Sequence, residues 1–397
     1  MLARRKMYYS FLDFFKMMKY LLLGQQTLVV QAFEKKISEY FNEANVITTA
    51  SGREAIVIAL KSLGLVPGDE IIVPALTLGE LIPLLKKEGY TVVLADVDEY
   101  TFNVTAKSIS KVLTLQTKCI MVTHLFGVPV EMTEIMNLAK DKNIKVLEDC
   151  AHAMFAQANK KAVGLWGDIS ILSFEGNKPL PAYGGGAIIT TNPDLISYAN
   201  KVLGKQYALK FPILKKYIMT VVEELFLMSP LFKPVASVLF SEKFQVTFEK
   251  YYRGMNDKVR PKSRFTSFQA EVGLENFERY KKKQNENHDK KLLLESHLDL
   301  KKYRVQKYNS GDICSFYNTT ILCDDAVAAK KIKAKLFKEG YDSGIGSEVI
   351  DSCDKYFEGT YQSQYAKQIE DRILLLPIHD GTSNRDVKSI AKLLNEF

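Results

Sequence analysis

Runs of continuous apolar residues recur between residues 46 and 192 and alternate with segments of helical periodicity. The runs lie at 71–74, 91–96, 119–123, 144–149, 169–174 and 187–190. Unbroken apolar runs are typical of strands buried on both faces, as in a parallel sheet covered by helices. Segments such as 131–142 have a helical pattern. The pattern therefore predicts an α/β core with a mostly parallel central sheet flanked by helices.

The pattern changes after residue 203. Residues 207–240 combine large apolar side chains, three prolines and four lysines, which favours one or two amphipathic helices. Residues 266–300 predict a long charged helix, and 303–397 mix short strands with helices at 326–339 and 384–395. We expect an N-terminal basic and apolar helical segment (1–30), a large α/β domain (31–260) with an apolar-basic helical insertion (205–245), and a smaller C-terminal α+β domain (261–397).

The composition is that of a globular protein of 397 residues, with 47% hydrophobic and 25% charged residues. The net charge is +8, and the first twenty residues contribute five basic residues and one acidic residue. The basic residues do not cluster with a nucleic-acid recognition motif, so nucleic acid is the least favoured use of this charge. Five scattered cysteines without a C-x-x-C pair favour neither a disulfide framework nor a structural zinc site, and indicate a reduced, cytoplasmic compartment.

The N-terminal residues 1–23 are basic and apolar, but charges interrupt them and no cleavage site follows. They do not predict a signal peptide or a membrane span. Two interpretations remain for 1–23 and for 207–240. They lie at a membrane interface, with lysines facing anionic headgroups, or they pack within the protein or across a dimer.

Three segments carry candidate chemistry. In the first, Ser51 and Glu54 form a capping box at the start of an apolar helix, and Gly52 lets an anion approach the backbone N–H groups. In the second, a strand ends at Asp149 and a small-residue turn with His152 follows. Acids at the carboxyl end of a strand in an open sheet are well placed for a cofactor.

The third segment places Lys178 in a short loop between two strands, followed by three glycines. Partial desolvation there lowers the pKa of the amine and makes it a nucleophile for carbonyls. A lysine for a Schiff base, an acid for a pyridinium nitrogen and a phosphate cup together indicate pyridoxal 5'-phosphate.

The motifs SGREAI, GLVPGDEIIVPALT, VVLADVDEYTFNV, VLEDCAHA, SFEGNKPL and GGGAIITTN occur in this order between residues 51 and 192. In this the chain resembles the DegT/StrS family of pyridoxal-phosphate sugar aminotransferases, which have the fold of aspartate aminotransferase. Several independent motifs in order make the resemblance specific. It is dense over residues 40–195 and thinner toward the C-terminus.

The resemblance implies a role for each matched residue. Lys178 corresponds to the Schiff-base lysine, Asp149 to the acid that keeps the ring nitrogen protonated, and His152 to a residue packed beside the ring. Ser173 corresponds to a phosphate ligand, with the backbone of Gly52 and Arg53 on the other side of the phosphate.

Three positions depart from the family pattern. Arg53 replaces a threonine, and its guanidinium binds phosphate or faces solvent. Leu78 replaces the aromatic ring that stacks on the cofactor. Lys262 stands where the second subunit of a homodimer contributes an asparagine to a shared active site.

The function implied is transfer of an amino group from an amino acid, by resemblance glutamate, to a keto sugar. In this family the sugar is typically nucleotide-linked, in polysaccharide or natural-product biosynthesis. Two alternatives stay open. One is a pyridoxal-phosphate enzyme of the same fold acting on another carbonyl or a lipid-linked substrate, and the other is a catalytically idle cofactor-binding protein. The expected location is cytoplasmic, in solution or peripheral at the inner face of the membrane.

Overall fold

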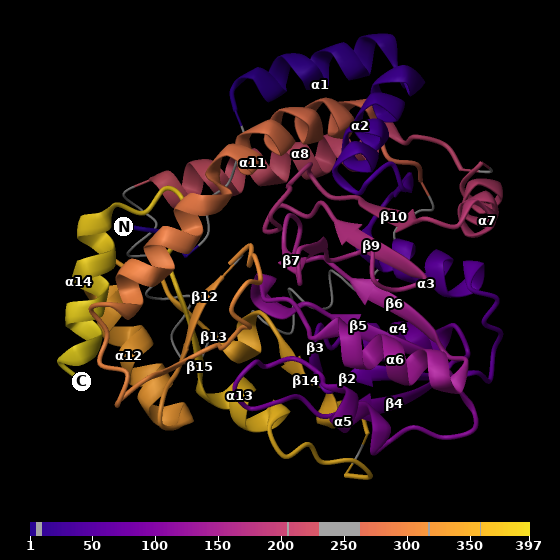
Figure 1. Ribbon diagram of the computed structural model, residues 1–397. Coiled ribbons are helices and arrows are strands. Elements are labelled where there is room, and N and C mark those ends of the chain that lie inside the picture. Colours follow the sequence, from indigo (N-terminus) through magenta and orange to yellow (C-terminus); the bar gives the residue numbers. More distant parts are fainter. Residues whose placement is uncertain (5–9, 205, 230–262, 317, 358) are drawn as a thin grey trace.

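A seven-stranded sheet and a four-stranded sheet organise the computed structural model, which describes residues 1–4, 10–204, 206–229, 263–316, 318–357 and 359–397 (Figure 1). The large sheet contains, in spatial order, β1 (Asn45–Thr49), β10 (Gly186–Thr190), β9 (Ile169–Ser173), β6 (Lys145–Asp149), β5 (Thr117–Thr123), β2 (Glu70–Pro74) and β4 (Thr91–Ala95). Only β10 runs against its neighbours. The predicted mostly parallel sheet is confirmed, and each of the six apolar runs contributes a strand to it.

The second sheet is antiparallel throughout. It contains, in spatial order, β11 (Arg304–Val305), β12 (Thr319–Leu322), β15 (Ile373–Leu376) and β13 (Gly344–Ile345). Two short ribbons complete the pairing, β3 (Leu76–Thr77) with β14 (Asp351–Ser352) and β7 (Gln157–Ala158) with β8 (Lys161–Ala162). The ribbon of β3 and β14 connects the second sheet to the loop that follows β2.

Helices cover both faces of the large sheet, and others pack on the second sheet. The α-helices of the described residues are α1 (Leu12–Leu23), α2 (Thr27–Tyr40), α3 (Gly52–Ser62), α4 (Leu81–Lys87), α5 (Ala106–Ser110), α6 (Met132–Lys142), α7 (Pro193–Leu203), α8 (Lys210–Met228), α11 (Ser267–Glu295), α12 (Ala326–Lys338), α13 (Ala366–Arg372) and α14 (Asn384–Asn395). Along β10, Ile188 packs in the core that contains α3 and α7, whereas Ile189 packs in the core that contains α2 and α11. This alternation is the two-residue period of a strand buried on both faces.

The long helix α11 links the two sheets (Figure 1). Its N-terminal part packs with α2 through Ala270 and Phe277, and its last turn places Leu294 in the core of the second sheet with α12 and α14. A capping box of Thr266 and Gln269 begins it.

The expected domain boundaries remain predictions. Residue 30 falls inside α2, and residue 260 lies outside the described residues. Only residues 206–229 of the expected insertion are described, and they contain α8. No helix in the described ranges combines the length and apolar character needed to cross a bilayer.

Candidate active site

Several of the predicted site residues lie at or just after the carboxyl ends of strands in the large sheet. β6 ends at Asp149 and β9 ends at Ser173, and the Cα register pairs Asp149 with Thr123 of β5 and Ile171 of β9. The turn after β1 leads into α3 at Gly52. Loops from several strands therefore meet at one edge of the sheet, which is where open α/β folds bind ligands.

Lys178 lies in a tight loop between β9 and β10. Its N–H donates to the carbonyl of Glu175 at 2.9 Å, and the N–H groups of Ala182 and Gly184 both donate to the carbonyl of Phe174 at 2.9 Å. Burial lowers the pKa of Lys178 to about 8, although the carboxylates of Asp149 and Glu175 oppose that shift. A substantial fraction of the amine is thus neutral near neutral pH, as a carbonyl nucleophile requires.

Asp149 is buried at the end of β6, with 6% of its surface exposed. Burial raises the pKa of its carboxyl, while the N–H of Ala151, donating at 2.9 Å, and the charge of Lys178 act against that rise. A buried carboxylate with spare lone pairs is suited to pair with a cationic N–H group, whose charge offsets the cost of burial.

His152 is a neutral ring stacked beside Phe126. The two ring centroids lie 6.1 Å apart, and the N–H of Phe126 donates to Nδ1 of His152 at 3.4 Å. Burial, followed by the positive charge of Lys178, holds the pKa of His152 well below its ordinary value. Lys178 therefore acts electrostatically on both Asp149 and His152, so the structure brings these three predicted residues together.

Gly52 and Ser173 face each other across the start of α3. A Cβ placed on Gly52 would lie 3.1 Å from Cβ and 3.3 Å from Oγ of Ser173. Ser51 caps the helix by accepting from the N–H of Glu54 at 3.1 Å, but the other half of the expected capping box is not formed, because Oε2 of Glu54 accepts from the N–H of Ala50 at 2.9 Å. The glycine keeps a small space beside the serine hydroxyl and the positive end of the helix dipole, a suitable environment for a phosphate group.

Of the three positions that depart from the family pattern, two, Arg53 and Leu78, lie in the described part of the chain. The guanidinium of Arg53 forms an ion pair with Glu80 at 3.3 Å, so neither of the two predicted roles describes it fully. Leu78 is 40% exposed, in the loop between β3 and α4. Lys262 lies outside the described residues, one position before Ser263.

Sequence reasoning missed two residues of this site. Asn177 precedes Lys178, and its Oδ1 is buried without a hydrogen-bond partner in the described part of the chain. Phe126, which stacks on His152, has a left-handed backbone (φ 55°). Because Asn177 is next to Lys178 in the sequence, its place in the site could have been predicted. The contact of Phe126 with His152 could not, because the two residues are 26 positions apart.

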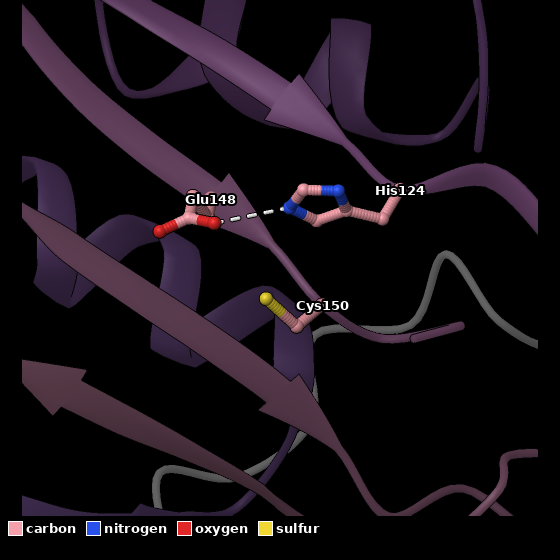
Figure 2. A group of neighbouring side chains, drawn as sticks. All are labelled: His124, Glu148 and Cys150. Carbon is pink, nitrogen blue, oxygen red and sulfur yellow. Dashed lines mark hydrogen bonds and ion pairs between the residues drawn. The ribbon is translucent and has the colours of Figure 1, made fainter. Parts of the chain in front are cut away.

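His124, Glu148 and Cys150 form a buried cluster around the end of β6, and each contributes an atom within 4.8 Å of the others (Figure 2). Nδ1 of His124 accepts from the N–H of Val130 at 3.0 Å, which puts the proton on Nε2, and Nε2 donates to Oε2 of Glu148 at 3.1 Å. Burial holds the pKa of the Cys150 thiol well above its ordinary value. Both imidazole nitrogens are thus engaged by protein groups, and hydrogen bonding accounts for the cluster.

Glu148 also accepts three backbone hydrogen bonds. The N–H groups of Gly164, Trp166 and Gly167 donate to it at 2.8, 2.7 and 2.7 Å. The carboxylate therefore fixes the loop before β9, and His124 fixes the turn after β5. Both flank Asp149.

The sequence profile of the DegT/DnrJ/EryC1/StrS aminotransferase family matches residues 19–395. Two curated relatives are similar over part of the chain. GDP-perosamine synthase of Escherichia coli O157:H7 is 39% identical over 166 residues, which are 42% of this chain and 46% of that protein. UDP-N-acetyl-3-dehydro-alpha-D-glucosamine 3-aminotransferase of Acidithiobacillus ferrooxidans is 38% identical over 175 residues, 44% of this chain and 47% of that protein. The chain thus matches about half the length of these relatives.

Solved structures agree with the fold over its whole length. The aminotransferase TlmJ from Streptoalloteichus hindustanus superposes with a TM-score of 0.78 at 18% identity, covering 100% of this chain and 98% of that one. DesV of S. venezuelae, solved with a ketimine intermediate, gives a TM-score of 0.76 at 18% identity, covering 97% and 93%. At such identities the likeness establishes the fold.

Proposed function

Since the chain belongs to the DegT/DnrJ/EryC1/StrS aminotransferase family, we propose that it is a pyridoxal-phosphate-dependent aminotransferase that aminates a keto sugar. The observation that carries the proposal is the grouping of Lys178, with a pKa lowered to about 8, and the buried carboxyl of Asp149. Lys178 supplies an amine that is partly neutral near neutral pH, and Asp149 supplies a buried carboxyl close enough to feel the charge of Lys178. Transamination through this cofactor needs both.

The residues present fit the cofactor. Gly52 and Ser173 would hold its phosphate, because a side chain on Gly52 would fill the space beside the serine hydroxyl. Asp149 would hold the ring nitrogen, and His152 would lie against the ring. The bound cofactor would supply a carbonyl for the lysine and an electron sink for the substrate carbon.

Lys178 would also move the proton that transamination requires. With its pKa lowered to about 8, the Nζ can accept a proton from the substrate carbon and return it to a neighbouring atom within the same pH range. Burial holds the pKa of His152 well below its ordinary value, so it would orient groups by contact and hydrogen bonding without competing for that proton.

The proposed substrates are an amino acid donor, glutamate, and a nucleotide-linked keto sugar used in polysaccharide biosynthesis. Support comes from the names of relatives, among them GDP-perosamine synthase and the spore coat polysaccharide biosynthesis protein SpsC of Bacillus subtilis. We also infer a cytoplasmic homodimer with a shared site, to which Lys262 of one subunit contributes, and peripheral contact with the inner face of the membrane. Light scattering tests the dimer, which should have twice the mass of one chain.

The experiment that tests the activity compares Lys178→Ala and Lys178→Arg with wild type. Both variants should lose turnover at least about 10²-fold, because neither side chain can exchange the proton at neutral pH. Lys118→Ala, which removes an exposed lysine of β5, is the matched control and should keep full activity. The purified wild type should also lose the visible absorbance of its lysine-bound cofactor when glutamate is added.

Two results would contradict the proposal. Normal turnover of either Lys178 variant would remove the lysine from the mechanism. Unchanged absorbance of the wild type with glutamate and with a panel of other amino acids would favour a catalytically idle cofactor-binding protein.

A further inference from the structure

The outward side of α1 is covered with exposed apolar side chains. They are Phe11, Leu12, Phe14, Phe15, Met18, Leu22 and Leu23, and Phe11 is 80% exposed. The rings of Phe11 and Phe14 pack on that of Phe15 at centroid distances of 5.6 and 5.5 Å. The opposite side of the helix is already buried, through Met17 and Tyr20, in a cluster with Phe268 and Val272 of α11.

The outward side of α8 has the same character. Its exposed apolar residues are Phe211, Ile218, Met219, Val222 and Leu225, whose spacing places them along one side of a helix. Its inward side contributes Ile213, Leu214 and Tyr217 to the cluster that receives α1. Both helices are therefore apolar on two sides, and a helix of this kind ordinarily has both sides covered.

Part of the charge of these helices is directed inward, whereas Lys215 and Glu223 of α8 are exposed. Lys16 pairs with Asp13 and Glu275, and Lys19 pairs with Glu271 of α11. Lys216 pairs with Glu175. Exposed apolar side chains nevertheless outnumber exposed charged ones on the two helices.

We propose that the outward sides of α1 and α8, here called the α1–α8 surface, dock on the headgroup boundary of an anionic lipid bilayer. The seven exposed apolar residues at 11–23 bear no hydrogen-bonding group other than a thioether, whereas a protein interface carries about one hydrogen bond per 100–200 Å². Phenylalanine, leucine and methionine suit the acyl boundary. Lys215 lies in the exposed row between Phe211 and Ile218, where its stem can lie among lipid tails and its ammonium can reach a phosphate.

The same two helices hold the loop of Lys178. The hydroxyl of Tyr183 donates to Asp13 of α1 at 3.2 Å, and Lys216 of α8 pairs with Glu175, three residues before Lys178. Docking would therefore place this loop near the membrane surface. The docking itself is independent of transamination, while its relation to catalysis rests on the proposed function.

The experiment is vesicle sedimentation of the full chain with phosphatidylcholine vesicles, with and without phosphatidylglycerol. Two double variants, Phe14→Glu with Leu22→Glu and Val222→Glu with Leu225→Glu, place charges on the α1–α8 surface. Each should weaken binding to anionic vesicles by about tenfold or more, since two apolar side chains that would enter the lipid are replaced by carboxylates. Leu115→Glu, at a residue 95% exposed elsewhere, is the matched control and should sediment like wild type.

Further readouts separate insertion into lipid from purely electrostatic adsorption. In Phe15→Trp, which retains the apolar area, emission should shift to the blue on adding vesicles, beyond any shift of wild type. Binding should persist in part at about 1 M salt, where the Debye length is about 3 Å, because the apolar contribution is not screened. Loss of visible absorbance with glutamate, measured in every variant, reports the aminotransferase site separately.

Three outcomes would overturn the inference. They are a failure of wild type to sediment with anionic vesicles, equal sedimentation of the double variants and wild type, and an emission maximum of Phe15→Trp that does not move when vesicles are added. If light scattering showed instead that the double variants turn a dimer into monomers, and wild type bound no vesicles, the α1–α8 surface would be an interface between copies of this chain.

Discussion

At the scale of single residues, burial and neighbouring charges shift the pKa values of the site residues. An exposed lysine has a pKa near 10.5, and burial lowers that of Lys178 to about 8. The sequence predicted this shift from the loop position alone. It could not predict that Lys178 would in turn depress the pKa of His152, because that effect depends on the distance between two loops.

The pH dependence of cofactor capture follows from the pKa of Lys178. Only the neutral amine attacks a carbonyl, so the rate at which the cofactor-free protein captures pyridoxal phosphate should rise with pH and level off above about 8. Stopped-flow absorbance measures this rate. A rise centred near 10.5 would mean that the amine is solvated like an exposed lysine.

Glu148→Gln should destabilise the protein without touching the cofactor. The carboxylate oxygens of Glu148 accept from three backbone N–H groups and from His124, and an amide would turn its own donor toward two of these donors. The loss should be about 3 kcal/mol in the free energy of unfolding, measured with urea. Glu39→Gln makes the same change on an exposed carboxylate and should cost little. Equal stability of the two variants would contradict the role assigned to Glu148.

At the scale of elements, continuous apolar runs were sufficient to predict six strands of the large sheet. β1 was not predicted, because the segment 45–49 is short and includes two threonines. The N–H of Thr48 donates to the carboxylate of Glu34 in α2 at 2.8 Å, a contact that the local sequence does not reveal. The ion pair of Arg53 with Glu80 could not be predicted from the sequence either, because the fold brings together two residues that are 27 positions apart. Local capping was predictable, but contacts between elements were not.

Gly52→Ala should weaken cofactor binding while leaving the stability of the fold nearly unchanged. Alanine is the better helix former at the first position of α3, so the free energy of unfolding should stay within about 1 kcal/mol of wild type. The new methyl group would crowd Ser173 at 3.1 Å and should weaken the affinity for pyridoxal phosphate by about tenfold. Fluorescence titration measures the affinity, and Lys61→Ala near the other end of α3 is the control. An unchanged affinity would exclude Gly52 from the phosphate site.

At the scale of the whole molecule, α1 is joined to the catalytic loop through one buried carboxylate. Asp13, 2% exposed, accepts from Tyr183 and Lys16 and from the N–H of Ser10. The sequence left open whether residues 1–23 pack within the protein or lie at a membrane. The structure gives α1 one packed side and one exposed apolar side, so the two interpretations concern different sides of the same helix.

Asp13→Ala should loosen α1 and the loop of Lys178 together. The buried hydroxyl of Tyr183 would lose its acceptor, at a cost of about 2 kcal/mol. Hydrogen exchange should become faster both in α1 and in the loop around Lys178. Lys19→Ala, which removes a half-exposed ion pair, should change exchange little. Faster exchange in α1 alone would show that the loop is held by other contacts.

The first residues of the chain also pair with the far end of the molecule. The N–H of Leu2 donates to the carbonyl of Gly340 at 2.8 Å, the N–H of Asp342 donates back to Leu2 at 2.9 Å, and Arg4 pairs with Glu348 beside the second sheet. Asp13, a few residues later, binds Tyr183 in the other half. Residues 2–4 thus contact one half of the molecule and α1 contacts the other, as α11 does along its length. The two sheets should consequently melt in a single cooperative transition, and cofactor bound in one half should protect the other from heat.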